Sequence, residues 1–173
     1  DKNLLNNFRW GVKRVQDLIL KRIEFLNKLL IKPQSDSTQF DISNAENWKA
    51  ILHSSAKLSK NKSEGKEILC IESNSESIAG FCHTISLNPG YYKFEALVKT
   101  ENVPSENNQY GATIRTSIGA KEQSDKINGT TDWKKATCEF EVLPNTKTVD
   151  LICELKSKSG KALFSSIQLI KVK

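Results

Sequence analysis

Two histidines and four cysteines are the side chains best suited to catalysis or metal binding, and their spacing fits neither. His53 and His83 lie in separate segments, and neither is beside a serine-glycine elbow or at a metal-ligand spacing. The acidic residues show no recognisable acid–base pair, and the chain has no glycine-rich phosphate loop. We therefore expect a protein that is not an enzyme and has no metal centre. His83 alternates with apolar neighbours, which predicts a half-buried core histidine.

The cysteines have no CxxC spacing of the kind that binds zinc; they are Cys70, Cys82, Cys138 and Cys153. Cys138 and Cys153 each alternate with apolar residues, so we expect both to point inward. If their two segments formed a simple hairpin, Val142 opposite Val149 would place Cys138 opposite Cys153. A disulfide and a pair of buried free thiols both fit this pattern.

The net charge of +6 is concentrated at one end of the chain. Residues 1–33 carry eight basic and three acidic residues, so the remaining 140 residues have a net charge of only +1. A nearly neutral region gives no reason to expect nucleic acid as its ligand. No apolar run reaches the roughly 18 residues that a bilayer span needs, so we expect no transmembrane segment.

Residues 4–31 have the apolar spacing of one long amphipathic helix. The apolar positions recur every three or four residues and are Leu5, Phe8, Val12, Val15, Ile19, Ile23, Leu26 and Leu30. Pro33 ends the pattern. An apolar stripe of this length has to be covered, and the outer face of the domain that follows, a second copy of the chain or an upstream domain would cover it. The segment RVQDLILKRIEFLNKLL resembles the last helix of the spore-coat CotH kinase-like family, which implies that residues 1–33 are the tail of an upstream domain.

A polar linker, PQSDST, marks a change from helical to strand-like pattern, so we place a domain boundary between residues 33 and 34. Residues 34–173 contain short alternating segments with turn signals between them and no helix. One of the loops between strands is expected at KNKSEGK, residues 60–66. The most regular strand is expected at residues 88–103, where Tyr92, Phe94, Ala96 and Val98 form one face and alternate with a second set: Tyr91, Lys93, Glu95, Leu97 and Lys99. The predicted fold class is mainly β: an antiparallel jelly-roll β-sandwich preceded by one long amphipathic α-helix.

Several segments of the predicted sandwich resemble the family 4/9/22 carbohydrate-binding modules and their galactose-binding-like jelly-roll relatives. The segments are FDISNAENWKAI, PGYYKFEALVKTEN, GATIRTSI, GTTDWKKATCEFEVLPNTKTVDLICEL and SGKALFSSIQLIKV, within residues 38–173. The resemblance implies a jelly-roll domain that binds a poly- or oligosaccharide without catalysis. It also implies that the parent protein is secreted or lies at the cell surface.

The last strand departs from the family pattern at a position linked to calcium. Where the family usually has two aspartates, one of which helps to hold a structural calcium, this chain has Ser165 and Ser166. Asp41 and Glu46 remain as ligands near the first strand. Hydroxyl groups replace a carboxylate poorly on a hard cation, so we expect no tightly bound calcium and no other cofactor.

Sugar recognition needs a flat aromatic ring and a few polar groups that hold hydroxyls. Leu97 occupies the outward position of the central strand that is often aromatic in such modules, which leaves Tyr91 and Tyr110 as stacking candidates. The candidate hydrogen-bonding residues are Glu95, Lys99 and Arg115. Alternatively, Tyr91 packs under a loop and the charged residues form a solvated face. Trp48 and Trp133 are predicted to lie in the core.

Two hypotheses follow for the function. The first is a non-catalytic carbohydrate-binding module, with the ligand on one sheet or in the loops at residues 101–110 and 119–131. The second is a structural or protein-interaction sandwich without sugar binding, whose outer face is covered by residues 1–33.

Overall fold

The computed structural model describes residues 38–52, 56–106, 109–118 and 123–172, together with Val15, Ile19 and Arg22. The chain divides into two compact units, Asp1–Asp36 and Ser37–Lys173. This division lies three residues beyond the boundary predicted from the sequence, and the assignment of separate domains stays a prediction. In the first unit, the side chains of Val15 and Ile19 are 54% and 53% exposed.

The described part of the second unit consists of ten strands and one 3-10 helix. They are β1 (Thr38–Phe40), η1 (Ala45–Asn47), β2 (Lys49–Leu52), β3 (Ala56–Ser63), β4 (Lys66–Ser73), β5 (Ser77–Ile85), β6 (Gly90–Val103), β7 (Gly111–Thr116), β8 (Gly129–Val142), β9 (Val149–Ser157) and β10 (Gly160–Val172).

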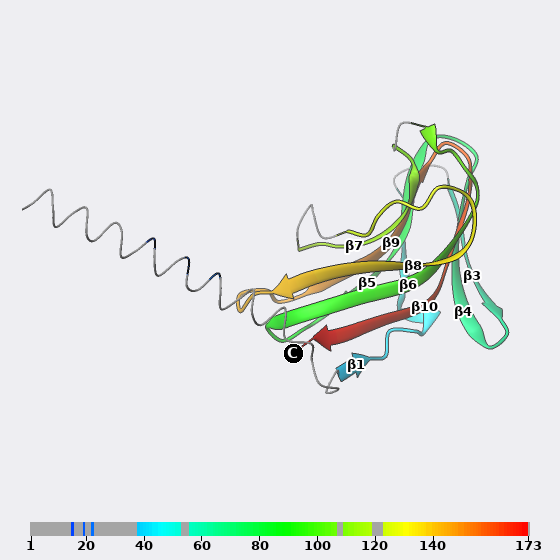
Figure 1. Cartoon of the computed structure of the whole chain (residues 1–173). Helices are drawn as coiled ribbons and strands as arrows, with labels where there is room; N and C mark the ends of the chain where they lie inside the picture. Colours follow the sequence, from blue (N-terminus) through cyan, green and yellow to red (C-terminus); the bar gives the residue numbers. More distant parts are fainter. Residues whose placement is uncertain are drawn as a thin grey trace, which may run out of the picture. The chain divides into compact units, whose positions relative to one another are not determined.

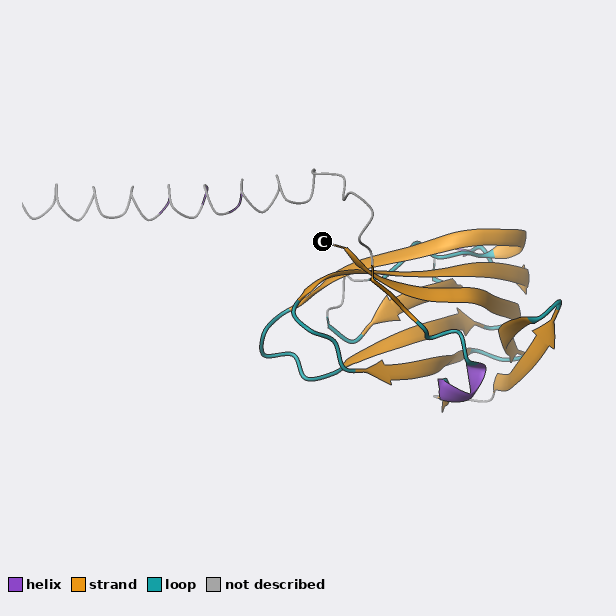
Figure 2. Cartoon of the chain, turned by 90° about the horizontal axis from the view of Figure 1, so that it is seen from below, coloured by secondary structure: helices purple, strands orange, loops and turns teal. Residues whose placement is uncertain are grey.

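The strands form two antiparallel sheets, and Figure 2 shows them as two layers with η1 at one side. Sheet A has the order β3-β4-β10-β6-β8, and β1 also pairs with β10. Sheet B has the order β2-β5-β9-β7. In Figure 1, β8, β6 and β10 lie side by side with β1 beyond them. The β-sandwich predicted from the alternating pattern is therefore confirmed.

The helical part of the predicted fold class is wrong. Among the described residues no helix has seven or more residues, and the short helix η1 has three. Within the described ranges the fold is a mainly β sandwich, and none of its helices has the predicted length. That prediction was based on residues 4–31, of which the structure describes Val15, Ile19 and Arg22; the others lie outside the described residues.

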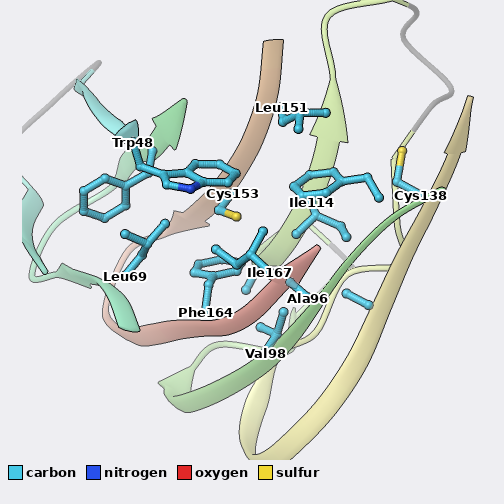
Figure 3. Close-up of a cluster of buried hydrophobic side chains, with 14 of the residues drawn as sticks. Trp48, Leu69, Ala96, Val98, Ile114, Cys138, Leu151, Cys153, Phe164 and Ile167 are labelled. Carbon is cyan, nitrogen blue, oxygen red and sulfur yellow. The ribbon is translucent and has the colours of Figure 1, made fainter. Parts of the chain in front are cut away.

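The central strand β6 supplies the core of the sandwich with every second side chain. Its inward residues Tyr92, Phe94, Ala96 and Val98 are at most 2% exposed, as the alternation predicted. Each aromatic or aliphatic side chain buried in this way contributes about 2 kcal/mol to stability. The inner faces of both sheets meet here, and Figure 3 shows Ile114 and Leu151 of sheet B opposite Ala96 and Val98 of sheet A.

Trp48 lies in the core, as the sequence predicted. Its side chain is 1% exposed, and its indole nitrogen donates a hydrogen bond to the carbonyl oxygen of Ile42 at 2.9 Å. The ring stacks on Phe94 with centroids 6.2 Å apart. His83 is half-buried as predicted, its ring centroid 5.6 Å from that of Trp48.

The hairpin proposed for Cys138 and Cys153 does not form. Both side chains point inward, at 1% and 0% exposed, but Cys138 lies on β8 in sheet A and Cys153 on β9 in sheet B. Figure 3 shows them on different strands, and all four cysteines are free thiols. The consecutive strands β8 and β9 thus belong to opposite layers, which removes the register on which the disulfide depended.

The segment predicted as a loop at residues 60–66 is largely strand. β3 and β4 form a hairpin in which Ser63 pairs with Lys66, so the turn consists of Glu64 and Gly65. Both turn residues have positive φ, 52° and 77°, as a two-residue hairpin turn requires. The sequence indicates a strand here only weakly, because β3 lies at the edge of sheet A and most of its residues are exposed and polar.

Candidate functional site

The outer face of sheet A carries most of the residues predicted to bind a ligand. On β6 these are Tyr91, Glu95 and Lys99, which alternate with the buried residues and therefore point away from the core. Leu97 shares this face and is partly exposed, as predicted. Tyr91 and Lys99 are eight residues apart, which corresponds to about 26 Å along the strand.

Glu95 is the centre of a charged network on this face. Its carboxylate accepts a hydrogen bond from Gln168 Nε2 at 2.7 Å and lies 2.7 Å from Lys135 Nζ. Lys93 Nζ lies 3.1 Å from the other carboxylate oxygen. We call these four residues, Lys93, Glu95, Lys135 and Gln168, the Glu95 cluster. Gln39 of β1 donates to Gln168 Oε1 at 3.3 Å, so the network crosses four strands.

The register of sheet A explains why the cluster forms. Glu95 is paired directly with Gln168 of β10, next to a β-bulge between Ser165 and Gln168. On the other side β6 pairs with β8, where Leu97 is opposite Lys135, so the long lysine side chain reaches Glu95 diagonally. Three neighbouring strands therefore place donors around one carboxylate.

Glu95 is 2% exposed although it lies on the outer face, because its neighbours cover it. This burial by itself raises the pKa of the Glu95 carboxyl, but hydrogen bonds from Lys135, Lys93 and Gln168 outweigh it, and the net effect is a lowered pKa. Glu95 is thus an ionised carboxylate at neutral pH, with Gln168 and Lys135 on one of its oxygens and the ion pair with Lys93 on the other. It positions the two lysines rather than acting as an acid.

Trp133 is exposed on the same face, which corrects the prediction that it belongs to the core. Its side chain is 38% exposed. Adjacent Asp132 accepts a hydrogen bond from the Trp133 backbone N–H at 2.8 Å and lies 3.7 Å from Lys99 Nζ of β6. The face therefore has an aromatic surface beside a lysine and an aspartate, a combination suited to a polar ligand with an apolar side.

Tyr91 lies at the opposite end of this face from Trp133. Its hydroxyl donates to Glu141 Oε1 at 3.0 Å, across the pair of strands β6 and β8. The side chain is partly exposed, and the strand pairing holds it on the same surface as the Glu95 cluster.

Tyr110 and Arg115 are not on this face. Arg115 lies on β7 in sheet B and binds Glu154 of β9, with Nη2 and Nε at 2.8 Å and 3.2 Å from one carboxylate oxygen. Tyr110 precedes β7 and is only 8% exposed; Lys158 Nζ lies 5.8 Å from its ring centroid. The five candidate residues thus divide into a group of three on sheet A and a pair associated with sheet B.

The residues compared above with the family's calcium site make contacts within the chain. Asp41 accepts hydrogen bonds from Ser43 N and Oγ at 3.2 Å and 2.8 Å, which lower the pKa of its carboxyl. Glu46 faces Lys60 at 3.9 Å, and the Ser165 hydroxyl donates to the carbonyl oxygen of Glu67. Among the residues that the structure describes, no three His, Cys, Asp or Glu side chains gather as a metal site would require.

Comparison with known proteins finds similarity in structure and not in sequence. No family model matches the chain, so the likeness to the CotH family has no support, and no curated protein matches it either. Many solved structures do match. TmCBM61, solved in complex with β-1,4-galactotriose, has a TM-score of 0.52 at 12% identity over 77% of this chain and 94% of that chain.

Two further solved structures extend this comparison. The family 11 carbohydrate-binding module of the cellulase Lic26A-Cel5E of Clostridium thermocellum has a TM-score of 0.50 at 15% identity, covering 81% of this chain and 97% of that chain. This chain has the fold of carbohydrate-binding modules. The enzymatically active domain of bacteriophage CBA120 tailspike protein 4 gives a TM-score of 0.56 at 13% identity, covering 75% of this chain but 20% of that chain.

No helix in the described part of the chain has the length and apolar character needed to cross a bilayer.

Proposed function

We propose that residues 34–173 are a non-catalytic carbohydrate-binding module of a larger secreted or surface protein, and that the outer face of sheet A binds the glycan. The observation that carries this proposal is the exposed ring of Trp133 beside Lys99 and Asp132, on a sheet face that continues to the Glu95 cluster. The carbohydrate-binding-module fold supports it independently.

The geometry suits an extended chain of sugars. An apolar side of a pyranose stacks on Trp133 and reaches Leu97, while Lys99 and Asp132 offer a donor and an acceptor to its hydroxyls. Further along the face, Lys135 and Lys93 are held in place by Glu95, which reduces the entropy lost when they bind a ligand. Tyr91 offers a second aromatic ring at the far end.

Affinity electrophoresis of the full chain against neutral and acidic polysaccharides tests this proposal. Retardation by at least one polysaccharide, weakened by Tyr91→Ala, supports binding along sheet A. Tyr110→Ala serves as a comparison because Tyr110 is nearly buried and lies away from this face. Unchanged mobility of the unmodified chain in every gel contradicts the proposal.

A structural or protein-interaction role is the second candidate. It is favoured by the pairing of polar groups on sheet A with one another, since Glu95 already engages both lysines and Asp132 already faces Lys99. A ligand has to compete with these contacts. Retardation in the polysaccharide gels separates the two candidates, because a purely structural sandwich leaves every mobility unchanged.

A further inference from the structure

Strand β3 forms one edge of sheet A and pairs on one side only, with β4. Figure 1 shows the two strands as a hairpin. Their pairing is continuous from Ala56 opposite Ser73 to Ser63 opposite Lys66, with no bulge. A regular edge strand of this kind presents a row of backbone groups to which a further strand can be added.

The two-residue turn of the hairpin determines which backbone groups of β3 face the free edge. Such a turn is closed by a hydrogen-bonded pair, here Ser63 and Lys66, and hydrogen-bonded and non-hydrogen-bonded pairs alternate from there along the hairpin. The residues that direct their N–H and C=O groups away from β4 are therefore Ala56, Leu58, Lys60 and Lys62. Within the described ranges no other strand pairs with them, and no other backbone group bonds to them.

The charges on β3 disfavour a second copy of the same edge as the added strand. The charged residues of β3 are Lys57, Lys60 and Lys62, and all three are exposed. Two copies of β3 side by side would bring six ammonium groups together, and edge lysines oppose edge-to-edge association for this reason. An acidic strand is attracted by the same lysines.

These lysines are only weakly engaged within the chain. Lys62 Nζ lies 3.4 Å from a carboxylate oxygen of Glu67, and the side chains are 65% and 36% exposed. Lys60 Nζ lies 3.9 Å from Glu46, whose side chain is 84% exposed. Lys57 has no ion pair among the residues that the structure describes. Exposed pairs of this kind contribute little to stability, so the ammonium groups can turn to the carboxylates of a partner.

We propose that the free edge of β3 binds an extended acidic segment of another protein, which adds to sheet A as a further strand. Leu58 packs against the core, and Lys60 and Lys62 follow it on the same face at steps of two. A complementary segment therefore has an apolar residue opposite Leu58 and carboxylates opposite the two lysines. This inference does not rest on glycan binding, because the edge of β3 is separate from the outer face of sheet A.

Amide hydrogen exchange of the full chain, measured by NMR with a synthetic peptide, tests the proposal. The peptide has seven residues and capped ends, with glutamate at its first and third positions, valine at its fifth and seventh, and threonine at the others. At a peptide concentration of about ten times the dissociation constant, exchange of the Leu58, Lys60 and Lys62 amides should slow about tenfold, because about one chain in ten is then free. The amides of the intervening residues already donate to β4 and should keep their rates.

A control peptide and three variants separate strand addition from attraction by charge alone. The control peptide has the same composition, but its two glutamates are adjacent and so point to opposite faces; it should bind about fivefold more weakly. Lys60→Ala should weaken binding of the first peptide about threefold. Lys60→Pro should weaken it about fivefold more, because proline removes an N–H that points to the partner and none that bonds to β4. Lys147→Ala, the same change at an exposed position outside β3, should have no effect.

Four results would overturn the proposal. The first is unchanged exchange at Leu58, Lys60 and Lys62 with the peptide at about 1 mM. The second is equal binding of the two peptides, and the third is equal binding by Lys60→Pro and Lys60→Ala. The fourth is slow exchange at the same three amides in the chain alone that increases with protein concentration, because a second copy then occupies the edge. If Lys60→Pro does not fold, the exchange rates of the unmodified chain decide.

Discussion

Replacing Glu95 with glutamine should destabilise the sandwich, because three donors converge on its ionised carboxylate. The substitution keeps the side-chain shape and a neutral hydrogen bond from Gln168 but removes the two ion pairs with Lys93 and Lys135. The lysine side chains are 34% and 57% exposed, so both ammonium groups regain water and the loss is smaller than for a fully buried pair. We expect the free energy of unfolding to fall by about 1–2 kcal/mol.

Urea denaturation followed by circular dichroism at pH 7 measures this loss, and its pH dependence tests the cause. The folded-state pKa of Glu95 is lowered, so its stabilising contribution is complete above the unfolded-state pKa of about 4.3 and disappears as the pH falls through the folded-state value. The difference between the unmodified protein and Glu95→Gln should therefore shrink below about pH 4. Glu139→Gln, on an exposed position of β8, is the matched control and should change stability by less than about 0.5 kcal/mol. Equal stability of the Glu95 variant and the control at pH 7 would refute the reasoning, as would a difference that grows on acidification.

Three further outcomes follow from the sandwich itself. Gly160→Ala should lower the free energy of unfolding by more than about 2 kcal/mol, because φ is 95° and the new Cβ would lie 2.5 Å from the carbonyl oxygen of Asn102. Gly65→Ala should lower it by about 1 kcal/mol, because Gly65 also has a positive φ but has open space around it. Equal losses of stability for the two variants in thermal melts would contradict this reasoning. Ser73→Ala should lower the free energy of unfolding by about 1–3 kcal/mol, because the buried Ser73 hydroxyl forms hydrogen bonds with the Ser77 hydroxyl and the carbonyl oxygen of Ser157. An unchanged midpoint in urea denaturation would contradict the role of these hydrogen bonds. In the folded protein a thiol reagent should react first with Cys82, the one cysteine of the four that is not buried. The reaction should be slow at pH 7, because burial, together with Asp150, raises the pKa of the Cys82 thiol. Fast reaction of Cys138 or Cys153 would contradict the buried positions of these two residues.

The inner faces of the strands were predictable because burial imposes a simple alternation. Tyr92, Phe94, Ala96 and Val98 had to share one face of any strand through residues 90–103, and the structure buries all four. The pairing of strands was not predictable in the same way. β8 and β9 follow each other in sequence but lie in different sheets, since long-range packing and not turn length decides their partners.

The prediction that Trp133 lies in the core was wrong, although the alternation of residues along β8 already indicated an outward position. Cys138, Ala136 and Phe140 share one face of β8, and counting back in steps of two from Ala136 leads to Lys134, so Trp133 falls on the outer face with Lys135. The prediction gave more weight to the large apolar side chain of tryptophan than to this alternation of inward and outward positions. The Glu95 cluster had no sequence signal, because Lys93, Lys135 and Gln168 are brought together by strand register and by the bulge in β10.

The most direct test of the central claim is isothermal titration calorimetry with a polysaccharide that retards the unmodified chain. Trp133 exposes 38% of its surface, roughly 90 Å² of a tryptophan side chain. Covering about half of it contributes about 1 kcal/mol, and ring stacking adds about the same. Trp133→Ala should therefore weaken binding by roughly 30-fold, whereas Ile78→Ala, which has the same exposed fraction, 38%, but lies on sheet B, should bind like the unmodified chain. Unchanged affinity of Trp133→Ala would contradict the account.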